Sequence, residues 1–396
     1  MKTQTAPSLR ERLDSPSANP FRHVPPLDGI RGVGILLVML GHFSAGLSDH
    51  LKTRLFGISL TIDLFFVLSG FLITSLLLEE WSRKGTISMR NFYVRRGLRL
   101  LPALFLLLGV TVLIALFTDL LPAKLTIIEA IAAALYVYPV VIILRPSEVF
   151  LLHLWTLSIE EWFYFCWPAL LAVVGLRKGT ARRLQLVVGS LIVFVVLCGA
   201  LRVAGGNGPI TRLVITFRPD SLFYGALLAI FVRKLPDWRT PLFDRIAAVV
   251  GPLGIVGFLY FDLFAVYPRR PGLTEESFHD EAFGSWNYQL GIICATLLIF
   301  HVSARQHSRW SRFFSWRPWV EIGFLSYGLY LWHQPIFLLV NDHWYRFHRD
   351  SMPWGVFAVL IGLVSFVVAL ASRYLVEKPA LKMKTRFEVV HFENKR

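Results

Sequence analysis

Long apolar segments alternate with short polar, basic segments along most of this 396-residue chain. The apolar segments run for about 20 residues, the length that an α-helix needs to cross a hydrocarbon core about 30 Å thick. The clearest examples, each with its flanks, are 35–47, 98–117, 184–201, 245–267 and 356–371. Backbone groups in lipid must find hydrogen-bond partners within their own segment, so these segments should be helical. The pattern predicts an all-α integral membrane protein.

The composition supports this class. Hydrophobic residues make up 55% of the chain and charged residues 17%, whereas a soluble domain is typically a little under half apolar. The net charge of +15 does not indicate a nucleic-acid partner, because the basic residues lie in short loops between apolar segments, where they orient a membrane protein. The three cysteines lie far apart in apolar segments, so we expect neither a disulfide framework nor a metal site.

The apolar segment 125–144 decides how many helices cross the membrane. With ten spans this segment is re-entrant or non-spanning, and inner segments hold 28 Lys and Arg residues against 10 in outer loops. With eleven spans, the same count becomes 17 inside and 21 outside. Cytoplasmic loops carry an excess of Lys and Arg, so we predict about ten spans. They lie near 30–48, 57–80, 97–118, 152–175, 184–203, 211–233, 245–266, 286–303, 319–341 and 354–376.

This topology places both termini in the cytoplasm and divides the chain into three parts. Residues 1–26 form a polar tail, 27–376 a single membrane domain, and 377–396 a short basic tail. We expect the lipid bilayer to be the main surroundings of the protein.

Few ionisable side chains lie within the predicted spans, and such groups are costly enough that they usually face a cavity and mark function. They are Arg31, His42, Asp63, His153, Glu160, Glu161, Arg218, Asp220 and His333. Five predicted helices place members of this set in the outer half of the membrane or near its middle. Arg31 lies at the inner end of the first helix, eleven residues before His42, so the two share a face about 16 Å apart. Any single member can be a packing group or half of an ion pair, but convergence favours a functional site.

The chemistry that suits this set is proton transfer coupled to acyl or group transfer. A neutral imidazole can take a proton from an attacking hydroxyl, and a carboxylate can orient that imidazole. An arginine can hold a developing oxyanion. The same groups also suit a proton relay in a transporter, and their spacing does not separate these alternatives.

A basic cluster precedes the third predicted span, in the stretch RNFYVRRGLRLLP (90–102). Arg96 and Arg99 are three residues apart, so they meet on one helical face at the cytoplasmic mouth. Guanidinium pairs suit phosphates, such as those of a nucleotide or coenzyme A. The alternative is an orientation signal of the kind that every inner loop carries.

Six stretches resemble, in order, motifs of the acyltransferase-3 family, membrane-bound bacterial enzymes that O-acylate glycans and some small molecules. They are PLDGIRGVGILLVMLGHF (26–43), IDLFFVLSGFLIT (62–74), RRGLRLLP (95–102), HLWTLSIEEWFYFCWP (153–168), FRPDSLFYGALLA (217–229) and LSYGLYLWHQPIF (325–337). The resemblance extends over the membrane domain and is weak in 234–319.

The resemblance implies a ten-helix fold in the plasma (inner) membrane of a bacterium. It implies acyl-coenzyme A as a co-substrate that enters from the cytoplasm, with no tightly bound cofactor, and an acceptor reached from the opposite side. It also implies that His42 is the central catalytic residue, with Arg31, Asp63 and Glu160 essential around it. Some family members carry a further soluble domain, so we expect either a separate periplasmic partner for a second transfer step or an acceptor met in the membrane.

We therefore expect a membrane acyltransferase that moves an acyl group, acetyl by preference, to a hydroxyl of a glycan, a glycolipid or a macrolide-like small molecule. Arg96 and Arg99 would bind the phosphates of coenzyme A. His42 would act as general base or carry the acyl group, oriented by Asp63 or Glu160. Side chains expected to face the acceptor are Arg218, Asp220, His153 and His333. An export permease or proton-coupled transporter is the alternative, and the oligomeric state is left open.

Overall fold

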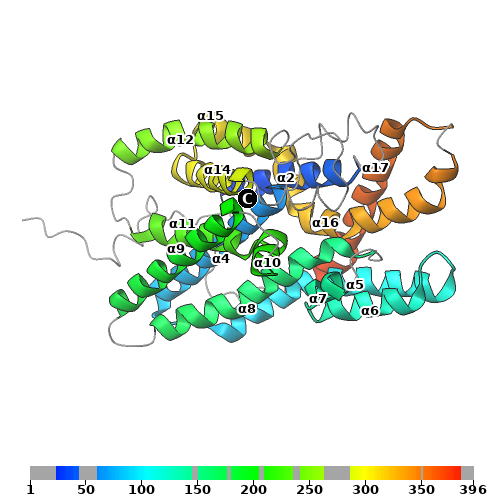
Figure 1. Cartoon of the computed structure of the whole chain (residues 1–396), viewed down its shortest axis with the longest axis horizontal. Helices are drawn as coiled ribbons and strands as arrows, with labels where there is room; N and C mark the ends of the chain where they lie inside the picture. The colour runs from blue at the N-terminus through cyan, green and yellow to red at the C-terminus, as the bar shows by residue number, and fades with distance from the viewer. Residues whose placement is uncertain are drawn as a thin grey trace, which may run out of the picture.

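The computed structural model describes residues 24–43, 60–144, 150–175, 180–204, 209–234, 241–262, 286–348 and 351–384. Most of the two predicted tails, 1–26 and 377–396, lies outside these ranges. The described part of the chain is helical and contains no strand. Figure 1 shows α12, α14 and α15 along one side of the bundle, α8 with α5, α6 and α7 along the other, and α2, α4 and α11 between them.

The helices that coincide with predicted spans, in chain order, are α2 (Pro25–Phe43), α4 (Leu60–Lys84), α5 (Met89–Phe117), α8 (Trp155–Gly175), α9 (Thr180–Ala204), α10 (Pro209–Phe217) with α11 (Pro219–Lys234), α12 (Pro241–Tyr260), α14 (Trp286–Ala304), α16 (Arg317–His343) and α17 (Trp354–Ser372). Shorter elements between and after them are α6 (Ala123–Ala134), α7 (Tyr138–Leu144), η2 (Leu152–Leu154), α15 (Arg309–Phe314), η4 (Tyr345–Phe347), the π-helical turn η5 (Arg373–Glu377) and α18 (Lys378–Lys384).

Six helical segments of the described chain are long and apolar enough to cross a membrane. They are Pro25–Phe43, Leu60–Lys84, Met89–Phe117, Leu152–Val174, Arg182–Arg202 and Trp354–Lys382. The structure therefore supports a membrane protein with several spans, while the ten spans and the cytoplasmic termini stay predictions.

The segment 125–144 is not one spanning helix. It is divided between α6, with 12 residues, and α7, with 7 residues, and the chain turns between them at Tyr136, whose φ is 56°. A 12-residue helix is only about 18 Å long, well short of the hydrocarbon thickness. This segment thus matches the non-spanning role that the charge distribution predicts.

The predicted span 211–233 is divided in two at Arg218, so the prediction of one continuous helix is wrong. α10 ends at Phe217 and α11 begins at Pro219. A proline disfavours the helical conformation of the residue before it, and Arg218 adopts a φ of 44°, in the left-handed region that few side chains adopt. The break directs Arg218 into the bundle instead of along a helix face, and its side chain is buried.

Two helix pairs approach each other at glycines. A Cβ atom at Gly32 of α2 would lie 2.0 Å from the carbonyl oxygen of Trp319 in α16, and one at Gly225 of α11 would lie 1.9 Å from that of Val67 in α4. Gly70 of α4 packs equally close to α11. In lipid, no hydrophobic effect drives helices together, so close packing must stabilise their association. Small residues allow that close packing.

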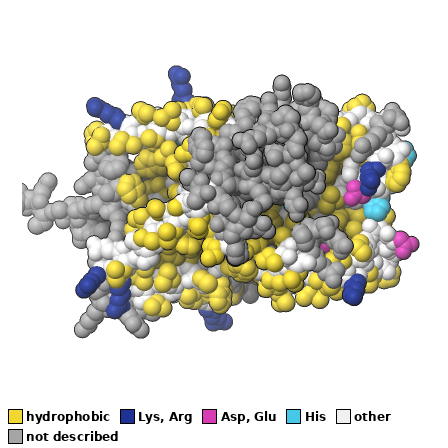
Figure 2. Space-filling model, in the orientation of Figure 1, with side chains coloured by type: hydrophobic (Ala, Val, Ile, Leu, Met, Phe, Trp, Pro, Cys, Tyr) yellow, Lys and Arg dark blue, Asp and Glu magenta, His cyan; other side chains and the backbone are white. Residues whose placement is uncertain are grey.

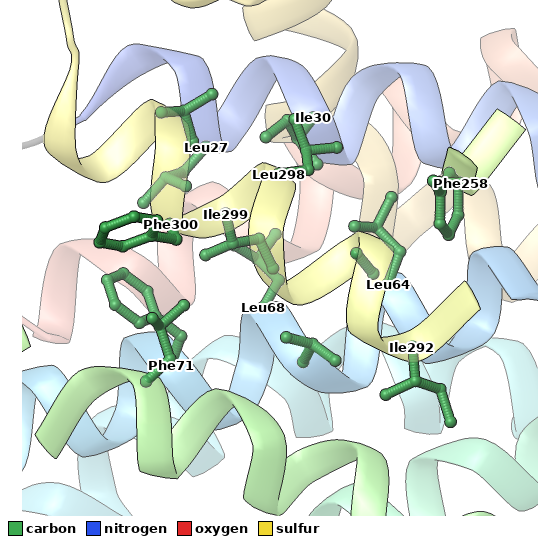
Figure 3. Packing of buried hydrophobic residues seen from close by; sticks show 14 of the residues in the cluster. Leu27, Ile30, Leu64, Leu68, Phe71, Phe258, Ile292, Leu298, Ile299 and Phe300 are labelled. Carbon is green, nitrogen blue, oxygen red and sulfur yellow. The ribbon is translucent and has the colours of Figure 1, made fainter. Parts of the chain in front are cut away.

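Apolar side chains fill the space between helices and also cover the outside of the bundle. Leu27 and Ile30 of α2 pack with Leu64 and Leu68 of α4 and with residues of α14 (Figure 3). Among the side chains that Figure 2 colours, most are hydrophobic, and the Lys and Arg side chains lie mainly around the periphery of the view. Phe117, for example, is 81% exposed. Such a surface suits contact with lipid.

Candidate active site

Three histidines from separate elements form a cluster. His42 near the end of α2 lies against His333 of α16, with 2.9 Å between His42 Nδ1 and His333 Nε2 and 5.0 Å between ring centroids. The ring of His153, in η2, lies 5.8 Å from that of His333. His153 and His333 are buried, and His42 is half-buried. The structure thus brings together three residues that sequence placed at similar depth but did not pair.

Backbone carbonyls fix the two buried rings of this cluster. His333 Nδ1 lies 2.8 Å from the carbonyl oxygen of Leu329, one turn earlier in α16. His153 Nε2 lies 3.2 Å from the carbonyl oxygen of Leu331. A carbonyl only accepts hydrogen bonds, so each of these nitrogens carries the proton. His153 Nδ1 is then an acceptor, and it is buried without a partner among the described residues.

Two cavities meet at a group of arginines. The mouth cavity, about 190 Å³, lies between α2, α4 and α5 and is lined by residues such as Leu27 and Ser75. The central cavity, about 90 Å³, lies further into the bundle. Both cavities are lined by Arg31, Ser69, Arg96 and Arg99. The arginines therefore belong to the wall that the two cavities share.

The central cavity extends from these arginines toward the histidines. Its wall includes Val38, one turn before His42 in α2, together with Thr156 and Tyr330. The Thr156 hydroxyl lies 2.5 Å from the Tyr330 hydroxyl, which also donates to the backbone carbonyl of His153. The Tyr330 ring lies 5.9 Å from that of His333. The far wall of the cavity is thus formed by residues that contact the histidine cluster.

The positive charge of the arginines is only partly neutralised. Arg31 Nη1 lies 3.7 Å from Asp28. The Arg96 guanidinium lies 3.7 Å from the ring centroid of Tyr164 and 4.0 Å from Glu161, and its buried Nε has no hydrogen-bond partner among the described residues. Arg99 is exposed. Guanidinium groups with free donors bind phosphate and carboxylate groups well.

The predicted carboxylate partners of His42 bond elsewhere. Asp63 Oδ2 accepts from Arg218 Nη1 at 2.9 Å, and its Oδ1 accepts from the Ser221 hydroxyl at 2.6 Å. Glu160 Oε1 accepts from Ser69 at 2.9 Å, and its Oε2 accepts from the Tyr164 hydroxyl at 3.1 Å. Glu160 still lines the central cavity. Each carboxylate therefore has both oxygens engaged, and the hydrogen-bond partner of His42 is a histidine.

Arg218 and Asp220 belong to a buried ionic network between α4, α9 and α11. Arg202 of α9 donates from Nη1 to Asp220 Oδ2 at 2.6 Å and to Gln289 at 2.8 Å, and its other amino group also bonds to Asp220. Arg202 is absent from the ionisable residues that the sequence pattern singled out, although only 1% of it is exposed. The signal that would have found it is a basic residue still within the last turn of an apolar run.

The predicted site residues therefore fall into three groups. His42, His153 and His333 form the cluster, and Arg31, Arg96, Arg99 and Glu160 line the central cavity beside it. Asp63, Arg218 and Asp220 lie in the ionic network. Together, the first two groups place arginines and a carboxylate along one cavity and a pair of imidazoles beside it.

Comparison with known proteins gives a consistent set of matches. The family model for the acyltransferase domain of acyltransferase-3 proteins matches residues 25–373. The O-acetyltransferase OatA of Staphylococcus aureus is 30% identical over 392 residues, which is 94% of this chain and 58% of that protein. The peptidoglycan O-acetyltransferase OatA of Listeria monocytogenes is 28% identical over 373 residues, 91% of this chain and 56% of that protein.

A third relative is the putative peptidoglycan O-acetyltransferase YrhL of Bacillus subtilis, 30% identical over 374 residues, with 90% of this chain and 55% of that protein covered. The chain thus spans little more than half the length of these relatives. No solved structure matches.

Proposed function

Because the chain belongs to the acyltransferase-3 family, we propose that it is a multi-pass enzyme of a bacterial inner membrane that transfers an acyl group, acetyl by preference, from acyl-coenzyme A to a glycan hydroxyl. The observation that carries this proposal is the pair of cavities that share Arg31, Arg96 and Arg99 in their walls, one of which is also lined by residues beside the pair His42–His333. Such a path suits a donor with a polyanionic end and a reactive thioester end.

In this proposal the arginines bind the donor. Arg96 and Arg99 hold the phosphates of coenzyme A, and Arg31 adds a third positive charge where the cavities join. The pantetheine arm then lies in the central cavity, whose remaining lining is largely apolar, with Val38 and Leu157 among its residues. Arg31 and His42 are about 16 Å apart along α2, a distance that a pantetheine arm can cover.

His42 performs the chemistry. Its imidazole takes the proton of the acceptor hydroxyl, and the oxygen attacks the thioester carbonyl carbon. The new C–O bond forms as the C–S bond breaks, and the leaving thiolate takes the proton back from His42. In the second route open to the same imidazole, His42 accepts the acyl group first and passes it to the hydroxyl.

The names of the relatives suggest the acceptor. Two of them are described as acting on peptidoglycan, so we propose a cell-wall glycan that is reached from the side opposite the donor. The buried Nδ1 of His153, which has no hydrogen-bond partner among the described residues, is an acceptor beside the cluster and would suit the hydroxyl of the acyl acceptor.

The test uses the whole chain in proteoliposomes with acetyl-coenzyme A labelled in the acetyl group and soluble peptidoglycan fragments. We expect label in an alkali-labile ester on the glycan for the parent and for His343→Gln, an exposed position at the end of α16. We expect no label for His42→Gln. If unmodified glycan instead crosses the bilayer without acquiring label, the protein is a transporter and the proposal is wrong.

A further inference from the structure

The hydrogen bonds of His333 determine which of its nitrogens carries the proton. His333 Nδ1 lies 2.8 Å from the carbonyl oxygen of Leu329, which can only accept. In the neutral imidazole one nitrogen is a donor and the other an acceptor. Nδ1 of His333 is therefore the donor, and its Nε2 presents a lone pair.

That lone pair then determines the tautomer of His42. His42 Nδ1 lies 2.9 Å from His333 Nε2, and two lone pairs cannot form a hydrogen bond. His42 must therefore carry its proton on Nδ1 and donate it to His333. Its Nε2 is left as the acceptor, and the described residues offer that atom no hydrogen-bond partner. A lone pair that no described residue occupies is available to act as a general base or as an acyl-accepting nitrogen.

We propose that His333 is the positioning residue of His42: it accepts the Nδ1 proton of His42 and so keeps Nε2 as the reactive nitrogen. This inference rests on the proposed function of His42 as the base or acyl carrier. The role is the one that a buried aspartate fills in serine hydrolases, where the wrong histidine tautomer costs about 10⁴-fold in kcat. Here a neutral imidazole takes that role, in place of Asp63 or Glu160.

The surroundings of His333 suit a fixed acceptor. The residue is fully buried. The centroid of its ring lies 6.4 Å from that of Phe43, 5.9 Å from that of Tyr330 and 5.8 Å from that of His153, which it meets in a T-shaped arrangement. A neutral partner also avoids the cost of holding an ionised carboxylate beside His42 within the membrane. When His42 becomes protonated in the reaction, its Nδ1 proton still points at the His333 lone pair, so the hydrogen bond persists through the step.

Three substitutions of His333 separate this role from simple packing. Gln is long enough to place its amide oxygen near the position of Nε2, where it can accept from His42. Asn is one methylene shorter and reaches only the position of Nδ1, and Leu has no acceptor. We expect kcat close to the parent for His333→Gln and at least about tenfold lower for His333→Asn and His333→Leu. The KM for acetyl-coenzyme A should stay unchanged in all three, because the donor site lies at the arginines.

Nitrogen NMR of protein labelled with ¹⁵N-histidine reads the tautomer directly. The His42 signals are those that disappear in His42→Gln. We expect His42 to carry its proton on Nδ1 in the parent, in His333→Gln and in the control His343→Gln, and to shift toward Nε2 protonation in His333→Leu. If His333→Leu does not fold, the comparison of Gln with Asn, two amides that differ by one methylene, gives the same answer.

Each outcome decides the inference. Equal kcat in His333→Gln and His333→Asn, whether high or low, would overturn it, as would a parent His42 protonated on Nε2. If the parent itself transfers no acetyl group, the proposed function fails, and the tautomer of His42 in the parent and in His333→Leu still shows whether His333 positions it.

Discussion

At the residue scale, replacing His42 tests whether this side chain acts in catalysis or only supports the structure through a hydrogen bond. Gln retains hydrogen-bonding capacity but neither accepts a proton usefully near neutral pH nor forms an acyl-imidazole. We predict that His42→Gln folds like the parent, still binds coenzyme A and loses at least about a hundredfold in transfer. Calorimetric binding and transfer of labelled acetyl should be measured on one preparation. Near-parental transfer would shift the catalytic role to His333 or Glu160.

Arg96 and Arg99 provide a second residue-scale prediction, because they line both cavities. We predict that Arg96→Ala and Arg99→Ala each weaken the binding of coenzyme A by about 1–3 kcal/mol, the range for a lost charge-assisted contact. Isothermal calorimetry measures the affinity for coenzyme A and for pantetheine, which lacks the phosphates. Only the affinity for coenzyme A should fall. Unchanged affinity in the double variant would reduce the pair to an orientation signal.

The buried pair Asp63–Arg218 should act on stability. Arg218 Nη1 lies 2.9 Å from Asp63, and both side chains are at most 5% exposed, so removing one partner leaves a buried charge at a cost of about 3–5 kcal/mol. We predict that Asp63→Ala and Arg218→Ala each lower the thermal unfolding temperature markedly in detergent, and that the double variant is less destabilised than the sum of the two.

The control for these Asp63 and Arg218 variants is Arg317→Ala. It removes an exposed ion pair with Glu321 and should change the free energy of unfolding by less than about 1 kcal/mol. If Asp63→Ala unfolds at the parental temperature yet transfers no acetyl group, Asp63 takes a direct part in the reaction, as the family resemblance implies.

At the element scale, the contact between α4 and α11 supports the buried ionic network. α11 begins directly after Arg218, which pairs with Asp63 of α4, and the two helices meet where a Cβ at Gly225 would lie 1.9 Å from the Val67 carbonyl oxygen. Even a methyl group there must push the helices apart. We predict that Gly225→Ala lowers the free energy of unfolding by about 1–3 kcal/mol, the typical cost of overpacking.

A matched glycine lies in α5. A Cβ at Gly109 would have no atom within 4 Å, so Gly109→Ala should be neutral or slightly stabilising, because alanine is the better helix former. Thermal unfolding in detergent compares the two variants. Equal unfolding temperatures for Gly225→Ala and Gly109→Ala would mean that α4 and α11 can separate without loss.

At the scale of the whole molecule, the charge asymmetry of 28 inner against 10 outer Lys and Arg residues predicts the topology. A reporter that is active only in the periplasm should be silent when fused after Arg183 and active when fused near Thr274. The opposite pair of results would mean that 125–144 crosses the membrane and that every later span is inverted. A fusion at the C-terminus should be silent as well.

The sequence by itself determined the helical membrane class and the family, and it singled out most residues of the candidate site. Apolar runs long enough to span lipid leave helix as the only conformation that satisfies the backbone. Polar groups inside such runs are conspicuous because they are costly there, which is why the sequence pattern alone singles out His42, His153 and His333. Even the break at Arg218 carries a sequence signal, the proline that follows it.

Only the tertiary structure decided which of these groups meet. Periodicity gives the depth of a residue along its helix and the face it shares with others, but not the rotation of that helix or its neighbours. His42 bonds to His333, 291 residues away, and Asp63 bonds to Arg218, 155 residues away. From the sequence we expected Asp63 or Glu160 to orient His42, whereas packing through glycines at Gly32 and Gly225 brings α2 onto α16 and α4 onto α11. These two pairs, His42 with His333 and Asp63 with Arg218, lie between helices that those close approaches bring together.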